Sequence, residues 1–289
     1  MDKITLGTRK VSIEFPGVKA LSDVDFEIST GTIHAVMGAN GAGKSTLMKV
    51  LAGSNPDYTG EVLYNGNVVE LRNPAAAKKL GIQIVYQEVD MALIPTLSVA
   101  ENVMFNDMVM NMGHKQFINY GKIRKDAKEA LARLNINIDV KRWCGTLTLA
   151  QKQMVLIARA VQNSCNFLIL DEPTAGLDPA GRDEILGLVS KMHRELGITI
   201  LLVSHSMEDV AEYVDRIIVM NHGAVMFDAL PKQVFAHYKE LEAVGLAAPQ
   251  VTYLVHELAE RGLPVDTQAT TAKEAAQTIL SALREKNVI

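Results

Sequence analysis

Apolar and polar residues alternate with period two at the start of the chain. The alternation covers residues 11–15 and 24–28 and is typical of strands with one buried face. Turn-forming residues follow each stretch, at 16–17 and 29–31. Residues 32–37 are mostly apolar and predict a buried strand. We therefore expect an antiparallel edge ahead of that strand.

Strands and helices alternate through the middle of the chain. Apolar runs predict strands at 82–86, 166–170 and 197–203. Residues 122–134 and 181–195 place apolar side chains at helical spacing with charges between them, which predicts amphipathic helices. Because alternating strands and helices build parallel sheets, the pattern predicts an α/β fold with a mainly parallel sheet.

Shorter elements and a helical tail complete the pattern. Asn65-Gly66 predicts a hairpin turn between two short strands. We also predict a helix at 207–214, strands at 216–220 and 225–227, and amphipathic helices at 251–261 and 271–285. The chain is accordingly divided into a main domain, residues 1–230, with a helical subdomain at about 88–160, and a mostly helical extension, residues 231–289.

A glycine-rich loop joins the strand at 32–37 to a predicted helix at 46–52. The loop, Gly38-Ala39-Asn40-Gly41-Ala42-Gly43-Lys44-Ser45-Thr46, fits the phosphate-binding pattern G-x-x-x-x-G-K-[ST]. Its glycines let backbone N–H groups approach a phosphate closely, and the helix N-terminus faces the anion. Lys44 is expected to reach the β- and γ-phosphates, and the Ser45 hydroxyl to ligate Mg²⁺. A chance match in a turn is disfavoured because a strand precedes the loop and a helix follows it.

Five further features follow this loop in a fixed order. They are Gln87 at a strand end, the segment Leu147-Thr148-Leu149-Ala150-Gln151, Asp171-Glu172 after an apolar strand, Asp178, and His205. Each feature is common alone. Together, in this order, they resemble the nucleotide-binding subunit of ABC transporters across nearly the whole chain. The resemblance implies a P-loop NTPase fold of the ABC type, an ATPase activity, and ATP and Mg²⁺ as ligands.

The resemblance also implies a role for each polar residue near the expected phosphates. Asp171 would hold Mg²⁺ through water, so Ser45, Gln87 and Asp171 form the expected metal set. Glu172 would polarise the attacking water, and Gln87 would sense the metal and that water and connect them to the helical subdomain. His205 would contact the γ-phosphate, with a buried core histidine as the alternative. The catalytic residues expected are therefore Glu172, His205, Gln87 and Lys44.

Four further positions are expected to take part in nucleotide binding. Thr148 and Gln151 belong to a segment that resembles the family signature Leu-Ser-Gly-Gly-Gln, and the Thr148 hydroxyl is expected at the γ-phosphate. Leu149 and Ala150 replace both signature glycines, as sugar-importer members of the family also allow. Asp178 belongs to a segment, residues 175–178, that resembles the family's loop at the dimer interface. The alternative role for Asp178 is to cap a helix. The Phe15 ring is expected either to stack on a nucleotide base or to pack in the sheet.

The resemblance divides within the chain. From about Val11 to Pro173 it is similar to the first ATPase domain of ribose- and galactose-type sugar importers, and Gln153-Met154-Val155 is one stretch that carries this likeness. From about Gly176 onward the chain resembles the ATPase of energy-coupling-factor vitamin importers. We therefore expect a hybrid joined near residues 171–176, of natural or designed origin.

Composition limits the compartment and the partners. Net charge is −4, which disfavours nucleic acid as a partner. The two cysteines, the missing signal-peptide pattern at the start and the absence of a long apolar run favour a cytoplasmic protein on the inner face of the membrane. The resemblance implies two partners: a second ATPase copy or paralogue, with residues 231–289 as a possible dimerisation element, and a transmembrane permease that docks around residues 87–145.

The function expected is that of the ATP-binding and ATP-hydrolysing subunit of a membrane importer of the sugar type or of the vitamin or metal type. Two alternatives stay open. One is a folded hybrid that binds ATP but hydrolyses it weakly or without coupling. The other is a soluble ABC ATPase outside transport, which is disfavoured because only 60 positions separate Gln87 from Leu147 and leave no room for a long coiled coil.

Overall fold

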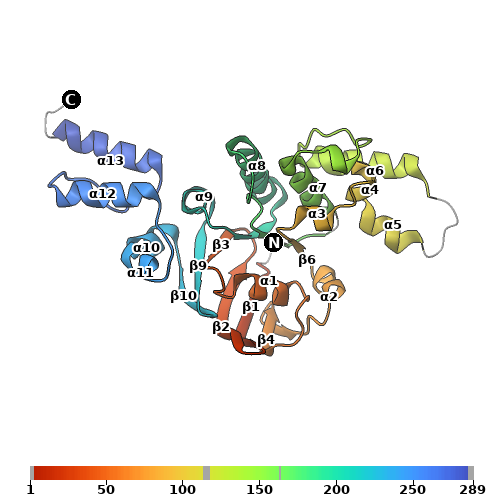
Figure 1. Ribbon diagram of the computed structural model, residues 1–289, viewed down its shortest axis with the longest axis horizontal. Helices are drawn as coiled ribbons and strands as arrows, with labels where there is room; N and C mark the ends of the chain where they lie inside the picture. The colour runs from red at the N-terminus through yellow and green to blue at the C-terminus, as the bar shows by residue number, and fades with distance from the viewer. Residues whose placement is uncertain (1–2, 113–117, 163, 286–289) are drawn as a thin grey trace. The chain divides into compact units, whose positions relative to one another are not determined.

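A computed structural model describes residues 3–112, 118–162 and 164–285 (Figure 1). The chain forms two compact units. The first consists of Met1–Leu47, Asp57–Glu70 and Val203–Ile289, and the second of Met48–Pro56 and Leu71–Leu202. The chain therefore leaves the first unit twice and returns to it. The domain boundary expected at residues 230 and 231 stays a prediction.

An antiparallel sheet with strand order β2-β1-β4-β5 lies in the first unit. Its strands are β1 (Thr5–Phe15), β2 (Val18–Ser29), β4 (Thr59–Tyr64) and β5 (Asn67–Val69). The turns at 16–17 and at Asn65-Gly66 are confirmed. The pair β1–β2 lies in this sheet and is not an edge of the sheet that holds residues 32–37, so that expected placement was wrong. The physical reason is that β1 pairs along its length with both β2 and β4.

The strand that leads into the glycine-rich loop also lies in the first unit. Strand β3 (Ile33–Met37) is buried at every position and pairs in parallel with β9 (Arg216–Asn221). β9 pairs antiparallel with β10 (Ala224–Ala229), which forms the antiparallel edge of this sheet. Helix α1 (Lys44–Leu51) follows the loop, and α9 (Met207–Tyr213) precedes β9. The predicted strand–loop–helix order is confirmed.

The helical tail belongs to the first unit as well. It consists of α10 (Pro231–Ala236), α11 (Tyr238–Ala243), α12 (Gln250–Glu260) and α13 (Ala272–Glu285). Val255, Ala269 and Ala275 form a small buried cluster between α12 and α13. Lys232 of α10 pairs with Glu274 of α13 at 2.7 Å. The two predicted amphipathic helices of the tail are therefore present.

Parallel strands and most of the helices form the second unit. β6 (Ile82–Val85) and β7 (Phe167–Asp171) pair in parallel, and β8 (Thr199–Val203) follows β7 in the strand order. The helices are α2 (Pro74–Lys79), α3 (Val89–Ala92), α4 (Val99–Val103), α5 (Phe105–Met112), α6 (Tyr120–Arg133), α7 (Leu149–Val161) and α8 (Pro179–Leu196), with a short 3-10 turn η1 (Cys144–Thr146). The mainly parallel α/β architecture is confirmed. Among the described residues, no helix combines the length and the apolar character needed to cross a membrane.

Candidate functional site

The glycine-rich loop curls around a buried ammonium group. Lys44 is the first residue of α1, and 6% of it is exposed. Its Nζ donates to the carbonyl oxygens of Gly38 at 2.8 Å and Ala39 at 3.1 Å. The ammonium group places a positive charge beside the glycine-rich loop at the start of a helix, a position that favours a bound anion. The buried ammonium group and the glycine-rich loop therefore fit a phosphate group.

The outer side of the same loop is open to solvent. Asn40, Gly41 and Ser45 are exposed and Thr46 is half-buried, whereas Gly38 is buried. Phe15, at the end of β1, is 46% exposed, so its ring does not pack fully in the sheet. That exposure favours the stacking alternative for Phe15, although its role stays a prediction.

Two consecutive acidic residues stand at the carboxyl end of β7 in the second unit. Asp171 is the last residue of β7 and is 8% exposed. Glu172 follows with a φ of 49°, in the left-handed region where non-glycine residues are uncommon. The Gln87 Nε2 donates to the Glu172 Oε2 at 3.3 Å, a long hydrogen bond. The structure thus brings together two of the predicted catalytic residues.

An open pocket of about 600 Å³ surrounds this pair within the second unit. Three segments line it: residues 87–91, Leu149 and Gln153 of α7, and the loop from Glu172 to Leu177. Among the described residues no group of three or more His, Cys, Asp or Glu side chains forms a metal cluster. Mg²⁺ at phosphate sites uses one or two carboxylates together with waters and phosphate oxygens. The oxygen donors of the expected set, Ser45, Gln87 and Asp171, are chemically suited to that ion.

The segment at 147–151 begins helix α7 with a capping box. The Thr148 Oγ1 accepts from the Gln151 N–H at 3.2 Å, and the Thr148 N–H donates to the Gln151 Oε1 at 3.3 Å. Both side chains thus fix the start of the helix, a role that the T-x-x-Q spacing indicates. Their expected contacts with nucleotide stay predictions.

The two residues that replace the signature glycines face different surroundings. Ala150 is 7% exposed, and its Cβ lies 3.1 Å from where a Cβ on Gly181 of α8 would stand. Its methyl group therefore packs on α8. Leu149 is 37% exposed and lines the pocket beside Glu172. Only Leu149 thus adds bulk to the open side of the loop.

The remaining predicted residues lie at element ends. The Asp178 Oδ1 accepts from the Gly181 N–H at 3.0 Å, so Asp178 caps α8. Its expected role at a dimer interface stays a prediction. His205 follows β8 and is exposed, so the alternative of a buried core histidine was wrong.

The sequence did not predict a group of polar contacts that connects α7 to α3 and α4. Arg159 of α7 donates from Nε to the Asn102 carbonyl oxygen at 2.6 Å and from Nη2 to the Asn102 Oδ1 at 2.8 Å. Its Nη1 donates to the Ala92 carbonyl oxygen at 2.7 Å. Arg159 thereby ties α7 to α4 and to the end of α3. No local pattern singled out Arg159 or Asn102, because their sequence separation is 57 residues.

Comparisons with known proteins agree with this geometry. A family model described as ABC transporter matches residues 21–175. The energy-coupling factor transporter ATP-binding protein EcfA2 of Clostridium tetani is 36% identical over 93% of this chain and 92% of its own length. A solved structure of cbiO1 from Clostridium perfringens, titled part of the ABC transporter complex cbiONQ, shares 33% identity at a TM-score of 0.70 and covers 87% of this chain and 98% of its own.

A second group of relatives comes from sugar import. A putative ribose/galactose/methyl galactoside import ATP-binding protein of Burkholderia ambifaria is 41% identical over 74% of this chain, which spans 41% of that protein's length. The family model covers the glycine-rich loop, Gln87, the signature segment and the Asp171-Glu172 pair, and the EcfA2 match extends over nearly the whole chain. A chain with these elements in this order belongs to the ATP-binding subunits of the ABC transporter family.

Proposed function

We propose that this chain is the ATP-binding and ATP-hydrolysing subunit that powers a membrane importer. The buried Lys44 ammonium, held by two loop carbonyls, is the observation that carries the nucleotide assignment. The relatives named EcfA2 and the sugar import ATP-binding proteins support the transport assignment. Phosphoryl transfer depends mainly on positioning and on charge neutralisation, and the residues around the loop and the pocket supply both.

The proposed division of labour follows the chemistry of each side chain. Lys44 neutralises charge on the β- and γ-phosphates, and the exposed Phe15 ring stacks on the base. Glu172 accepts a hydrogen bond from the attacking water, and Gln87 orients Glu172 through the bond already present between them. Mg²⁺, when bound, neutralises phosphate charge, and Ser45 and Asp171 are its proposed ligands.

We propose that ATP binding pairs two ATPase copies. In this pairing the Thr148 segment of one copy covers the glycine-rich loop of the second, and Asp178 lies at the shared interface. Thr148, Asn40 and Gly41 are exposed, as such an arrangement requires. Light scattering with Mg²⁺-ATP tests the pairing on the Glu172→Gln variant, which is expected to bind ATP but to hydrolyse it slowly. A variant that stays monomeric under saturating ATP contradicts the proposal.

We propose that a permease docks on residues around 87–145, of which 113–117 lie outside the described residues. Of the exposed large apolar side chains in the described part of this region, Met91 and Trp143 are the most open to solvent, at 82% and 60% exposed. Replacing both with serine is expected to abolish binding to a permease, whereas Val68→Ser, at an exposed apolar position of the first unit, leaves it unchanged. The protein is then held peripherally at the cytoplasmic face of the membrane.

The transported substrate class follows from which membrane component binds. The docking region resembles the sugar type and the tail resembles the vitamin type, so a hybrid is expected to bind sugar-type permeases and to self-associate through residues 231–289. Leu254 and Leu280 of the tail are 47% and 46% exposed, which supports a covered face in a dimer. Deleting the tail and measuring the nucleotide-free mass tests self-association. A full-length protein that is already monomeric without nucleotide contradicts it.

Turnover, ATP binding and co-purification with a permease together separate an importer subunit from the two alternatives. ATPase activity is measured against protein concentration, with and without the Glu172→Gln substitution. Turnover that rises with concentration and disappears in the variant supports a composite site in a dimer. ATP binding without turnover supports the weakly hydrolysing hybrid, and failure to co-purify with any permease supports an ATPase outside transport.

A further inference from the structure

The turn between β9 and β10 lies directly against the glycine-rich loop. The Gly223 N–H donates to the carbonyl oxygen of Ala42, inside the loop, at 3.1 Å. The Gly223 carbonyl oxygen accepts from the Ser22 N–H of β2 at 2.8 Å. One glycine therefore connects the phosphate loop to β2, the strand that follows Phe15 across a tight turn.

No side chain fits at this point of contact. A Cβ on Gly223 would lie 2.7 Å from the Ala20 carbonyl oxygen and 3.1 Å from the Leu21 Cα. A Cβ on Gly43 would lie 2.5 Å from the same Ala20 oxygen and 3.3 Å from the Gly223 Cα. The nearest atom to each added Cβ is a backbone oxygen, so rotating a side chain cannot relieve either clash. The loop, the turn and β2 are thus packed backbone to backbone.

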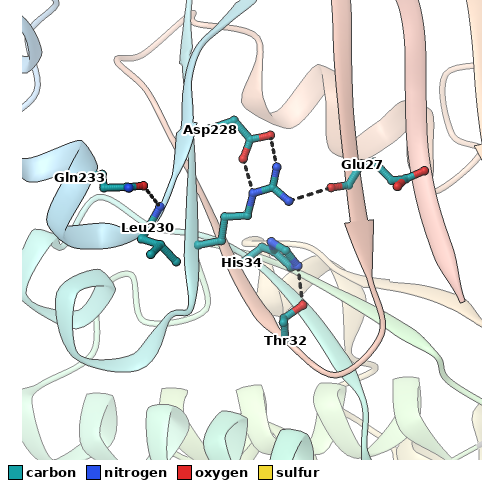
Figure 2. A network of polar contacts seen from close by, with 7 residues as sticks. Glu27, Thr32, His34, Asp228, Leu230 and Gln233 are labelled. Carbon is teal, nitrogen blue, oxygen red and sulfur yellow. Dashed lines mark hydrogen bonds and ion pairs between the residues drawn. The ribbon is translucent and has the colours of Figure 1, made fainter. Parts of the chain in front are cut away.

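The hairpin that carries the turn is also fixed at its other end. Arg216, the first residue of β9, donates through Nη2 to the Asp228 Oδ2 of β10 at 2.7 Å and through Nη1 to the Glu27 carbonyl oxygen of β2 at 3.3 Å (Figure 2). A hairpin anchored on β2 at both ends has little freedom to move its turn. Through its hydrogen bond to the Ala42 carbonyl oxygen, Gly223 therefore restrains the loop backbone at that point.

We propose that Gly223 is a positioning residue for nucleotide binding, which holds the phosphate loop in its binding geometry from behind. The proposal rests on the nucleotide site proposed above. Gly223 touches no nucleotide atom in this scheme and acts through Ala42 and Gly43. Displacing the turn moves the N–H groups that face the phosphates, and small displacements of positioning groups cost large factors in binding or rate.

The chain contains a matched control for this test. Asn65-Gly66 and His222-Gly223 are both two-residue hairpin turns in which both residues have positive φ, at 52° and 72° and at 47° and 77°. Alanine at either glycine thus meets the same backbone strain. A Cβ on Gly66 has nothing within 4 Å, whereas a Cβ on Gly223 collides with β2. The two substitutions therefore differ in one respect: only the methyl group added at Gly223 collides with a strand packed beside the glycine-rich loop.

The experiment measures ATP binding by calorimetry on Gly223→Ala and Gly66→Ala in the presence of Mg²⁺. We expect Gly223→Ala to raise the dissociation constant for ATP by at least about tenfold and Gly66→Ala to change it by less than about twofold. A purely structural role would lower the fraction of molecules that bind but leave the dissociation constant of the remainder unchanged. Equal dissociation constants in both variants overturn the proposal.

A second pair of variants covers the case in which Gly223→Ala does not fold. One glycine is inserted after His222, and one after Asn65 as its control, because hairpin loops tolerate insertions at little cost. Only the insertion after His222 is expected to weaken ATP binding. Loss of ATP binding in both insertions, or in neither, overturns the role of Gly223. If wild-type protein itself binds no ATP, the proposed function fails instead, which separates the two failures.

Discussion

The glycine-rich loop of the first unit and the Gln87–Glu172 pocket of the second unit are built in opposite ways. The loop is held by backbone: its carbonyls bind Lys44 at 2.8 and 3.1 Å, and β2 and the β9–β10 turn pack against it. The pocket is open, and a long hydrogen bond of 3.3 Å joins Gln87 to Glu172. For the function proposed above, this means a preformed phosphate site and a Gln87–Glu172 pair that has room to tighten on binding of nucleotide.

The largest expected effect separates the two regions by activity. Glu172→Gln removes the carboxylate that we propose polarises the attacking water, and we expect ATP turnover to fall by about 100- to 1,000-fold. ATP affinity is expected to stay within about twofold, because binding belongs to the loop. Steady-state hydrolysis and calorimetry measure the two quantities. Glu88→Gln, an exposed residue of the same pocket, is the matched control, and an equal loss of turnover there contradicts the assignment.

The second prediction reverses that pattern. Lys44→Ala removes the buried cation that we propose pairs with phosphate. Charge-assisted hydrogen bonds of this kind are each worth about 1.5–3 kcal/mol, so ATP affinity is expected to fall on the order of 100-fold. Lys49→Ala, at an exposed position of the same helix, is the control and is expected to leave affinity unchanged. Unchanged affinity in a folded Lys44→Ala protein would exclude the loop as the phosphate site.

A third substitution asks whether the second unit can be weakened without touching the loop. Arg159→Met leaves the carbonyl oxygens of Asn102 and Ala92 without their charged donor, and we expect the free energy of unfolding to fall by about 2–3 kcal/mol. Urea unfolding measures this loss. ATP affinity below the unfolding transition is expected to match wild type. Arg133→Met, at an exposed helix end, serves as the control.

The smallest effect concerns the strand behind the loop. Burial lowers the pKa of His34 to about 4, with the Arg216 charge as a second cause and Asp215 opposing it. His34 is 2% exposed, and its Nε2 lies 2.6 Å from the Thr32 Oγ1 (Figure 2). Because the unfolded chain takes up this proton near pH 6.5 and the folded protein does not until about pH 4, stability falls as pH drops between these values.

His34→Asn tests this contribution. At pH 5 the contribution of His34 to the pH dependence is about 2 kcal/mol by linkage, and less if the buried site relaxes. We expect the variant to lose less stability than wild type between pH 7 and pH 5, measured by urea unfolding at each pH. His193→Asn, at a half-buried helical position, is the comparison variant. A slope identical to wild type in His34→Asn would contradict a neutral buried imidazole.

The sequence by itself determined the elements and the local chemistry of this protein. Apolar runs predicted β3 and β7, and helical spacing predicted α6 and α8. The G-x-x-x-x-G-K-[ST] pattern marked Lys44, which begins α1. The T-x-x-Q spacing of Thr148 and Gln151 also contains the capping box found at α7. These features depend on neighbours a few residues apart, which is why a single sequence carries them.

Only the tertiary structure decided what supports these motifs. Three contacts join residues far apart in the chain: the hydrogen bond of Gly223 to Ala42, the hydrogen bonds of Arg159 to Asn102, and the packing of Ala150 on Gly181. The separate sheet formed by β1 and β2 was likewise decided by pairing with β4. Such contacts depend on how elements pack after the chain has folded, and residue spacing does not encode which backbone atoms will meet.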